Sequence, residues 1–367
     1  MKTSPQPSLR PGALRRWLTG LALTATVAIA QAQIGMSQLQ LEGLPVTLVY
    51  PSAQATQARS FGPFELQVAI DAVPSTGPRR LIVLSHGTGG SPLSDHTLAA
   101  TLARAGYVVA QPLHAGDNFQ DTSRAGPEAW ISRPSEVTRV IDGLARHPTW
   151  QPLLQLDRVG VHGMSAGGVT ALSLAGAQWR MLDLVRHCLA HTEADFGFCF
   201  NGVADADRQA QRRAGYERAR GVPEAFLPAT MTAVHGGHDP AAGDVRPDPR
   251  VAAVTLAVPV AAIYSTESLA RIRVPVGLVS AARDRMLLPR FHSGHVLQSC
   301  SRCTLLADLT GAAHMDLLSP WPESVARATA ALHPRGSEPE PGFDPAARQA
   351  AFDAIAVFYR RHLTLTP

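Results

Sequence analysis

The sequence predicts an α/β fold with a mostly parallel central sheet, helices on both faces and an inserted, cap-like region. Short apolar runs alternate with segments of helical spacing along most of the chain, which is typical of open parallel sheets. Runs such as Leu81 to Leu84 lack polar alternation, as expected for strands buried on both faces. Between 179 and 249 this pattern weakens and polar helical stretches replace it, which indicates the insertion.

Two early strands are expected at 45–50 and 64–73. The second alternates apolar and polar residues, as an edge or antiparallel strand does. A buried strand within 79–90 is followed by a helix at 94–106, which ends at a glycine.

The chain then continues with a buried strand at 107–114 and a helix at 133–148. Ser135 is the expected cap of that helix, and Pro148 lies just past its end. The segment 156–177 has the pattern of a strand, a sharp turn and a helix.

After the insertion the strand pattern resumes. The predicted elements are strands at 250–259, 274–284 and 303–314, a loop at 333–342 and a closing amphipathic helix at 344–363. No internal repeat is visible. Residues 33–367 are expected to form a single domain with the insertion at about 179–249.

The composition indicates a large buried core, in one large domain or two smaller ones, and no nucleic-acid partner. Of the 367 residues, 45% are hydrophobic and 17% are charged, so a large core can form. The formal charge of +4 comes from four cations in the first 32 residues, because without them 33 − 4 = 29 basic residues face 29 acidic ones. A neutral chain lacks the basic surface that binds a phosphate backbone.

The first 32 residues are predicted to be a signal peptide of the Sec type. A basic segment precedes the apolar stretch 17–30, and the small residues at 30–32 fit a cleavage site before Gln33. The alternative is a membrane anchor, but the stretch is shorter than the ~20 residues that a span needs. A twin-arginine route is less favoured, because the residues after Arg15-Arg16 fit it poorly. The mature protein is therefore expected to be periplasmic or secreted, with no later membrane span.

Four cysteines lie in the mature part, and three pairings are possible. Proximity in sequence favours two disulfides, which an exported protein can form. A zinc site is the alternative for the CxxC pair, but a second CxxC is missing and we expect no metal. The favoured pairs are Cys188–Cys199 and Cys300–Cys303.

Ser165 lies in the pattern Gly-Met-Ser-Ala-Gly at the turn between a predicted strand and helix. Such a turn strains the backbone, needs small neighbours and exposes the hydroxyl, so Ser165 is the candidate nucleophile. A serine needs a base, and His314 follows the last predicted strand in a loop of small residues. Asp284 ends the preceding strand and is the candidate acid. Capping of a helix is its alternative role.

Rival groups exist for the base and for the acid. Asp308 lies inside a predicted strand and Asp316 past the loop of the base, so both are less favoured than Asp284. The rival histidines are His86, His114, His162, His235, His238, His292 and His295.

Negative charge on a substrate oxygen requires preset N–H donors. The expected donors are the backbone N–H groups of Ala166, which follows the serine, and of Thr88, in the glycine-rich turn after the third core strand. A plain glycine turn is the alternative for this second segment.

Four polar residues at earlier strand ends are possible contacts of the substrate. A hydrogen-bonded loop is an equally good interpretation of them. They are His86, His114, Asp117 and Asn118. The segment 235–240 holds residues that can bind metals, but its glycine and proline favour a surface turn.

The segments SHGTGG, GYVVAQPLHAGDN, DRVGVHGMSAGG and GAAHMDLL together resemble the α/β-hydrolase superfamily. Within it, the chain is similar to exported bacterial proteins described as predicted dienelactone hydrolases, which are similar to platelet-activating-factor acetylhydrolase. The resemblance covers 46–314 and the closing helix. True dienelactone hydrolases use a cysteine nucleophile where this chain has Ser165, so their substrate is not carried over. The resemblance implies ester hydrolysis through an acyl-enzyme, without a cofactor.

We therefore expect an exported serine hydrolase that cleaves carboxylic esters, of small molecules or polymers, through the order Ser165, Asp284, His314. One alternative is the same triad acting on an amide, lactone or β-diketone, because the choice depends on the shape of the pocket. Another is a non-catalytic exported binding protein, since a fold does not dictate a function. The sequence does not indicate the acyl chain, the alcohol or the oligomeric state.

Overall fold

The structure, a computed structural model, describes residues 1–4, 33–200, 206–236, 248–332 and 339–365. The chain divides into two compact units, 1–31 and 32–367, and the described helices and strands belong to the second. The predicted signal peptide lies outside the described residues, apart from its first four.

Among the described residues, ten strands form one sheet in the spatial order β12-β11-β10-β7-β5-β6-β2-β1-β4-β3. Neighbours from β12 to β6 are parallel, whereas β2 is antiparallel to β6 and β1. The bounds are β1 Gln33–Leu41, β2 Leu44–Ser52, β3 Gln57–Phe61, β4 Phe64–Ile70, β5 Leu81–Ser85, β6 Val108–Pro112, β7 Val159–Met164, β10 Val251–Ala257, β11 Val276–Ala281 and β12 Cys303–Leu309.

Apolar cores lie on both faces of the sheet. Along β5 the side chains alternate between them: Leu81 and Val83 join one core, and Ile82 and Leu84 join the other. Helices α2 and α3 cover the first face, and α1 and α11 cover the second. The helices outside the insertion are α1 His96–Arg104, α2 Pro127–Arg146, α3 Gly167–Leu174, α8 Thr266–Ala270, α9 Ser293–Ser299, α10 Glu323–Leu332 and α11 Pro345–His362, with the 3₁₀ turns η1 Gln151–Leu153 and η3 His314–Leu317.

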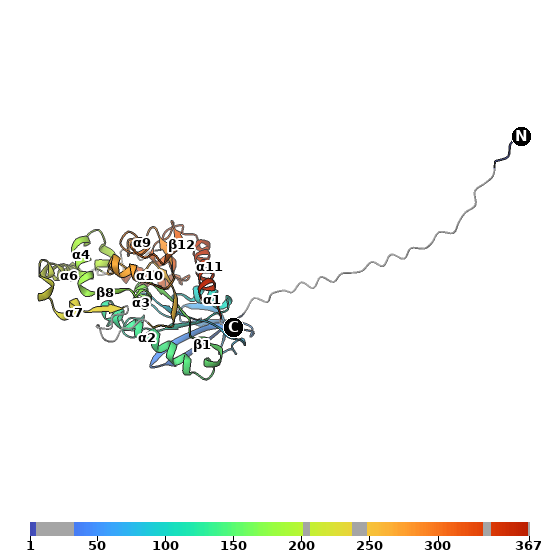
Figure 1. Cartoon of the computed structure of the whole chain (residues 1–367), viewed down its shortest axis with the longest axis horizontal. Helices are drawn as coiled ribbons and strands as arrows, with labels where there is room; N and C mark the ends of the chain where they lie inside the picture. Colours follow the sequence, from blue (N-terminus) through green and yellow to red (C-terminus); the bar gives the residue numbers. More distant parts are fainter. Residues whose placement is uncertain (5–32, 201–205, 237–247, 333–338, 366–367) are drawn as a thin grey trace. The chain divides into compact units, whose positions relative to one another are not determined.

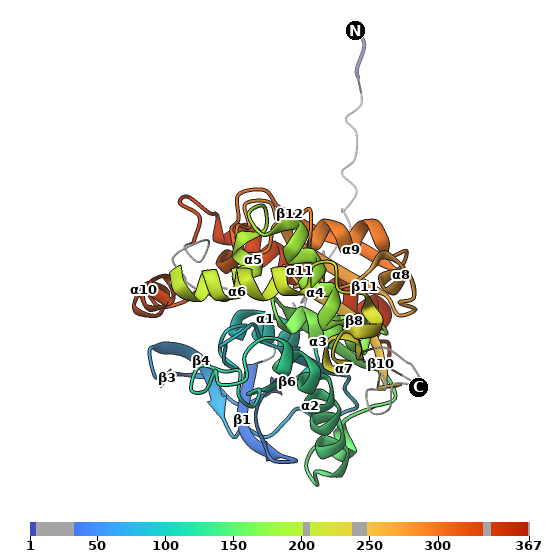
Figure 2. The same cartoon turned by 90° about the vertical axis from the view of Figure 1, so that its left-hand side faces the viewer.

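The region predicted as an insertion folds into short helices and a small antiparallel sheet of two strands. Helices α4 and α6 lie together in both views (Figures 1 and 2) and contact each other. Tyr216 on α6 donates a hydrogen bond to the carbonyl oxygen of Cys199 on α5 (2.7 Å). The bounds are β8 Gln178–Arg180, α4 Met181–His191, α5 Phe196–Phe200, α6 Ala206–Ala219, η2 Glu224–Phe226, α7 Ala229–Thr232 and β9 Val234–Gly236.

The prediction of a helix from 133 was wrong about its beginning. Helix α2 begins at Pro127 and passes through Pro134 without ending. The Ser135 hydroxyl donates to the carbonyl oxygen of Ser132, so Ser135 lies within the helix and is not its cap. A proline inside a helix removes one backbone hydrogen bond, and burial of this helix outweighs that cost.

Strands β1 and β3 were not predicted, and the last strand ends at Leu309, earlier than expected.

The four cysteines form two disulfides, Cys188–Cys199 and Cys300–Cys303. This is the pairing that proximity favours, and the two sulfurs of the CxxC segment are bonded to each other. The first disulfide joins α4 to α5 within the insertion. Among the described residues, no helix has the length and apolar character to cross a bilayer.

Candidate active site

Ser165 lies at the carboxyl end of β7, where the chain turns into α3, and its φ of 54° is in the left-handed region. The glycines beside it have no room for a larger side chain. A Cβ at Gly163 would lie 2.1 Å from the carbonyl oxygen of Gly167, and one at Gly167 would lie 1.9 Å from that of Ser85. The small residues on both sides are therefore required by close backbone packing, and the strain presents the hydroxyl outward.

The structure brings Ser165, His314 and Asp284 into one hydrogen-bonded chain. His314 Nε2 lies 3.0 Å from Ser165 Oγ, and His314 Nδ1 lies 2.7 Å from Asp284 Oδ2. A carboxylate can only accept, so Nδ1 carries the proton and Nε2 is free to accept the serine hydrogen. Both His314 and Asp284 are 2% exposed, which shields this chain from competing water.

The rival groups have other partners. His162 bonds to the Thr255 hydroxyl inside the sheet, and burial lowers its pKa to about 3. His292 faces Asp195 at 3.1 Å. Asp308 is exposed on β12, and Asp316 accepts the backbone N–H of Ala313. His238 and most of 235–240 lie outside the described residues.

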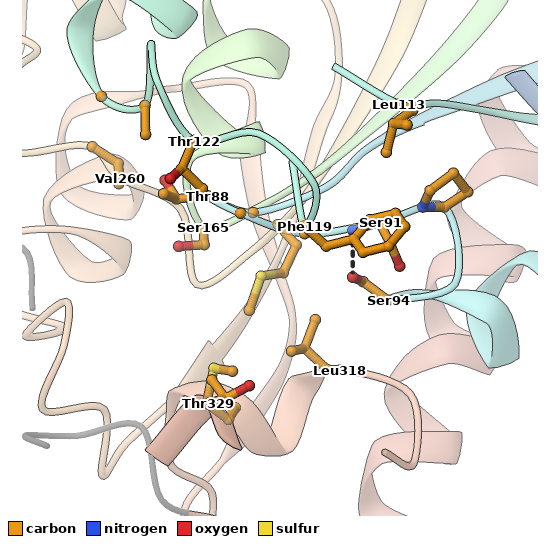
Figure 3. Close-up of a pocket in the computed structure, with 18 of the residues that line it drawn as sticks. Thr88, Ser91, Ser94, Leu113, Phe119, Thr122, Ser165, Val260, Leu318 and Thr329 are labelled. Carbon is orange, nitrogen blue, oxygen red and sulfur yellow. Dashed lines mark hydrogen bonds between the residues drawn. The ribbon is translucent and has the colours of Figure 1, made fainter. Parts of the chain in front are cut away.

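Of the two expected oxyanion donors, Thr88 lines the same cleft as Ser165, and Ala166 is the buried residue that follows the serine in the chain. Figure 3 shows Thr88 directly beside Ser165. Among the backbone hydrogen bonds of the described residues, none is donated by the N–H of Thr88 or of Ala166. Ala166 precedes the first residue of α3, where helical N–H groups have no intrahelical acceptor. Neither N–H group is therefore committed to a backbone acceptor in the described part of the chain, as an oxyanion donor requires.

The four polar residues proposed as possible substrate contacts do not line this cleft. They are buried beneath the turn that carries Thr88 and bond to its backbone and to one another, so the hydrogen-bonded interpretation is the one the structure supports. Their exposed fractions are 2% for His86, 0% for His114 and Asp117, and 6% for Asn118. Arg133, which is fully buried among them, was missed, because an arginine in a charged helical stretch is typical of a solvent-facing position.

The cleft has a volume of about 1260 Å³ and is mainly apolar. Val260, Leu318 and Phe119, labelled in Figure 3, line the same cleft as Ser165. Trp130, Phe198 and Trp321 belong to the same lining. Among the described residues that line it there is no carboxylate, and the ionisable groups besides Tyr216 are His314 and Arg212. Much of the lining comes from strands β1 and β2, the β3–β4 turn, the insertion and α10. The insertion was expected to be cap-like, whereas no sequence pattern linked the other segments to the site.

No protein-family model and no curated protein sequence matches the chain. Among solved structures, a ferulic acid esterase from Streptomyces cinnamoneus is similar, with a TM-score of 0.55 and 16% identity over 92% of this chain and 93% of the other. At this identity the likeness concerns the fold. Together with the sheet order and the serine at the β7–α3 turn, it shows that the chain has an α/β-hydrolase fold.

Proposed function

We propose that the protein is an exported serine ester hydrolase that works through an acyl-enzyme on Ser165. The observation that carries this proposal is the buried chain from Ser165 through His314 to Asp284, at a strained turn beside two N–H groups that have no backbone acceptor among the described residues. A buried aspartate, a histidine and a hydroxyl in this order activate the hydroxyl as a nucleophile.

The reaction proceeds in two halves. Ser165 Oγ attacks the acyl carbon while its proton passes to His314 Nε2, and Asp284 stabilises the charged ring. The N–H groups of Thr88 and Ala166 donate to the oxygen that becomes negative. The carbon–oxygen bond then breaks, the alcohol leaves with the proton from His314, and the acyl-enzyme remains. Water then attacks the acyl carbon while its proton passes to His314, the bond to Ser165 Oγ breaks, the carboxylic acid is released and His314 returns the proton to Oγ.

The cleft favours bulky, uncharged esters. Its volume exceeds the 300–1,000 Å³ typical of small-molecule pockets, and its lining is apolar. Hydrophobic contact adds about 0.8 kcal/mol per buried CH₂, so the chain length of the acyl group should strongly affect kcat/KM. The resemblance to predicted dienelactone hydrolases and to platelet-activating-factor acetylhydrolase does not select the substrate.

Export is part of the proposal. Disulfides persist mainly in oxidising compartments, and the structure contains two. The expected signal sequence precedes them. Protein recovered from the periplasm or medium should therefore begin at Gln33 and contain both linked cysteine pairs in non-reduced digests.

The test is hydrolysis of p-nitrophenyl acetate, butyrate, octanoate and palmitate by the mature protein, with Ser165→Ala beside it. Methyl ferulate is added because the similar structure is a ferulic acid esterase. We expect activity that rises with chain length and falls by at least 10³-fold in the variant. Turnover that Ser165→Ala leaves unchanged would refute the proposal. Labelling by a fluorophosphonate without hydrolysis of any ester would redirect it to amides, lactones or diketones.

A further inference from the structure

We propose that the buried ion pair Arg133–Asp117 is a positioning device that holds the turn 86–90 so that the Thr88 N–H points into the cleft. Neither side chain touches the substrate. The inference rests on the proposed ester hydrolysis and adds residues that act through another group.

The pair is held completely inside the protein. Arg133 on α2 and Asp117, in the loop after β6, are both 0% exposed, and Arg133 Nη2 lies 2.7 Å from Asp117 Oδ2. Removing two charges from water is costly, and their attraction often fails to recover that cost. Two apolar side chains could fill the same space in the core without that cost. The backbone groups that this pair binds indicate a more specific role.

Both members of the pair bind the turn that carries Thr88. Asp117 Oδ1 accepts the N–H of Gly89 at 2.9 Å. Arg133 Nη1 donates to the carbonyl oxygen of His86 at 2.6 Å, and its Nη2 lies 3.4 Å from that of Gly87. Arg133 and Asp117 thus hold the peptide groups on both sides of Thr88 by hydrogen bonds.

The Gly87 carbonyl decides where the Thr88 N–H points, because both belong to one peptide plane. In a trans peptide the C=O and N–H point in opposite directions. The Gly87 oxygen also accepts from His86 Nδ1 at 2.7 Å and from the Gly90 N–H at 3.1 Å. Drawing this oxygen inward, toward His86 and Arg133, therefore directs the Thr88 N–H outward, toward Ser165.

The imidazole of His86 completes the support. Its Nδ1 donates to the Gly87 oxygen, so its Nε2 is left to accept the backbone N–H of His114, at 3.3 Å. Burial, then the nearby His114 and Arg133, hold the pKa of His86 well below its usual 6.5. The ring therefore stays neutral at pH 7 and keeps this single donor–acceptor arrangement.

Two variants test the pair. Asp117→Asn retains an oxygen for the Gly89 N–H but removes the carboxylate that pairs directly with Arg133, so that Glu136 is the remaining negative charge near it. Arg133→Lys keeps the charge near Asp117 but cannot also bind the carbonyl of His86, because an ammonium lacks the planar fork. Loss of an oxyanion donor costs about 10²–10³ in kcat, so we expect a misdirected one to cost about 10–100-fold, with KM within twofold.

A boronic acid that forms a tetrahedral adduct with Ser165 gives the readout that distinguishes positioning from general damage. Its inhibition constant should rise by the same factor by which kcat/KM falls, because both depend on the oxyanion donors. The matched control is Asp157→Asn. Asp157 pairs with the buried Arg80 before the amino end of β5, far along the strand from Ser85, and its loss should leave kcat within twofold.

Several outcomes would overturn the inference. Folded variants that keep wild-type kcat, a loss matched by Asp157→Asn, or a change confined to KM would each do so. If neither variant folds, hydrogen exchange in the wild type decides: the amide of Gly89 should exchange as slowly as those of β5, and fast exchange refutes the role. Failure of the proposed function is distinct, because Ser165→Ala would then retain wild-type turnover.

Discussion

The two oxygens of Asp284 have different tasks. Oδ1 accepts the backbone N–H groups of Met286 and Leu287, at 2.9 and 2.8 Å, and Oδ2 faces His314. The first pair of bonds fixes the carboxylate on its own loop. The second fixes the imidazole tautomer, so both oxygens are needed to present a basic Nε2 to Ser165.

We expect Asp284→Asn to lower kcat by about 10³–10⁴-fold, because an amide at this position allows the wrong imidazole tautomer. Asp308→Asn is the matched control, since Asp308 is exposed on β12 and should keep full turnover. Steady-state kinetics on p-nitrophenyl butyrate checks both, with circular dichroism to establish folding. Equal losses in the two variants would contradict this role.

For single residues, the sequence predicts those roles that depend on a position at the end of a strand and on the order along the chain. Ser165, Asp284 and His314 come from such positions, and the structure brings them together. Arg133 and the buried state of Asp117 could not be predicted, because they depend on how α2 packs against a turn more than 40 residues away in the chain. Side-chain burial of this kind leaves no local pattern.

Among the elements, the short helix α5 borders the cleft and is held from several sides. Phe198 and Cys199 on it line the cleft, and the disulfide from Cys199 ties it to α4. Asp195, just before it, bonds to His187 at 2.8 Å and to His292 at 3.1 Å. Burial alone would raise the pKa of Asp195, but these bonds lower it to about 2, so it stays charged.

Removing the Cys188–Cys199 disulfide by alanine substitution of both cysteines should loosen this wall of the cleft. We expect KM for p-nitrophenyl octanoate to rise about threefold or more while KM for the acetate changes little, and stability to fall by about 3 kcal/mol. Removing Cys300–Cys303 in the same way is the control, because neither residue lines the cleft. Urea unfolding and the two KM values provide the measurement. An equal rise of KM for p-nitrophenyl octanoate in the two double variants would contradict the role of Cys188–Cys199 in the cleft wall.

The order and type of the core elements were predictable, whereas several boundaries were not. Buried parallel strands carry continuous apolar runs, so β5, β6, β7 and β11 are visible in the sequence. Helix α2 begins earlier than predicted, because Pro134 is a local helix-breaking signal that tertiary packing overrides. Strand β3 is polar and exposed, so no hydrophobic pattern marks it.

Over the whole molecule, buried histidines couple stability to pH. Burial lowers the pKa of His162 to about 3, that of His96 to about 4, and those of His86, His114 and His292 below 6.5 as well. In the unfolded chain these rings take up protons below about pH 6.5. Their full contribution is therefore present above pH 6.5 and is lost as the pH falls toward the folded values.

Between pH 6.5 and 4.5 the buried histidines should lower the free energy of unfolding, whereas Asp95, whose pKa burial raises to about 7, acts in the opposite direction. The prediction therefore concerns the difference between the wild type and a histidine variant. His162 alone should account for a loss of about 2 kcal/mol between pH 6.5 and 4.5, because its ring is protonated in the unfolded chain but not in the folded one. His162→Asn, which keeps a hydrogen-bonding group near the Thr255 hydroxyl, should show a shallower decrease. Urea unfolding at several pH values tests this, and parallel curves for variant and wild type would contradict it.

The contacts of Arg80 have a consequence for when the protein can fold. Its guanidinium, buried before β5, donates to the carbonyl oxygen of Thr364, 284 residues further along the chain, and Tyr359 donates to the carbonyl of Val161 on the strand that leads to Ser165. A nascent chain lacks these partners until synthesis reaches them. The part of this sheet face that α11 covers is therefore completed only when synthesis reaches the last residues, so removal of the segment after Pro345 should prevent stable folding.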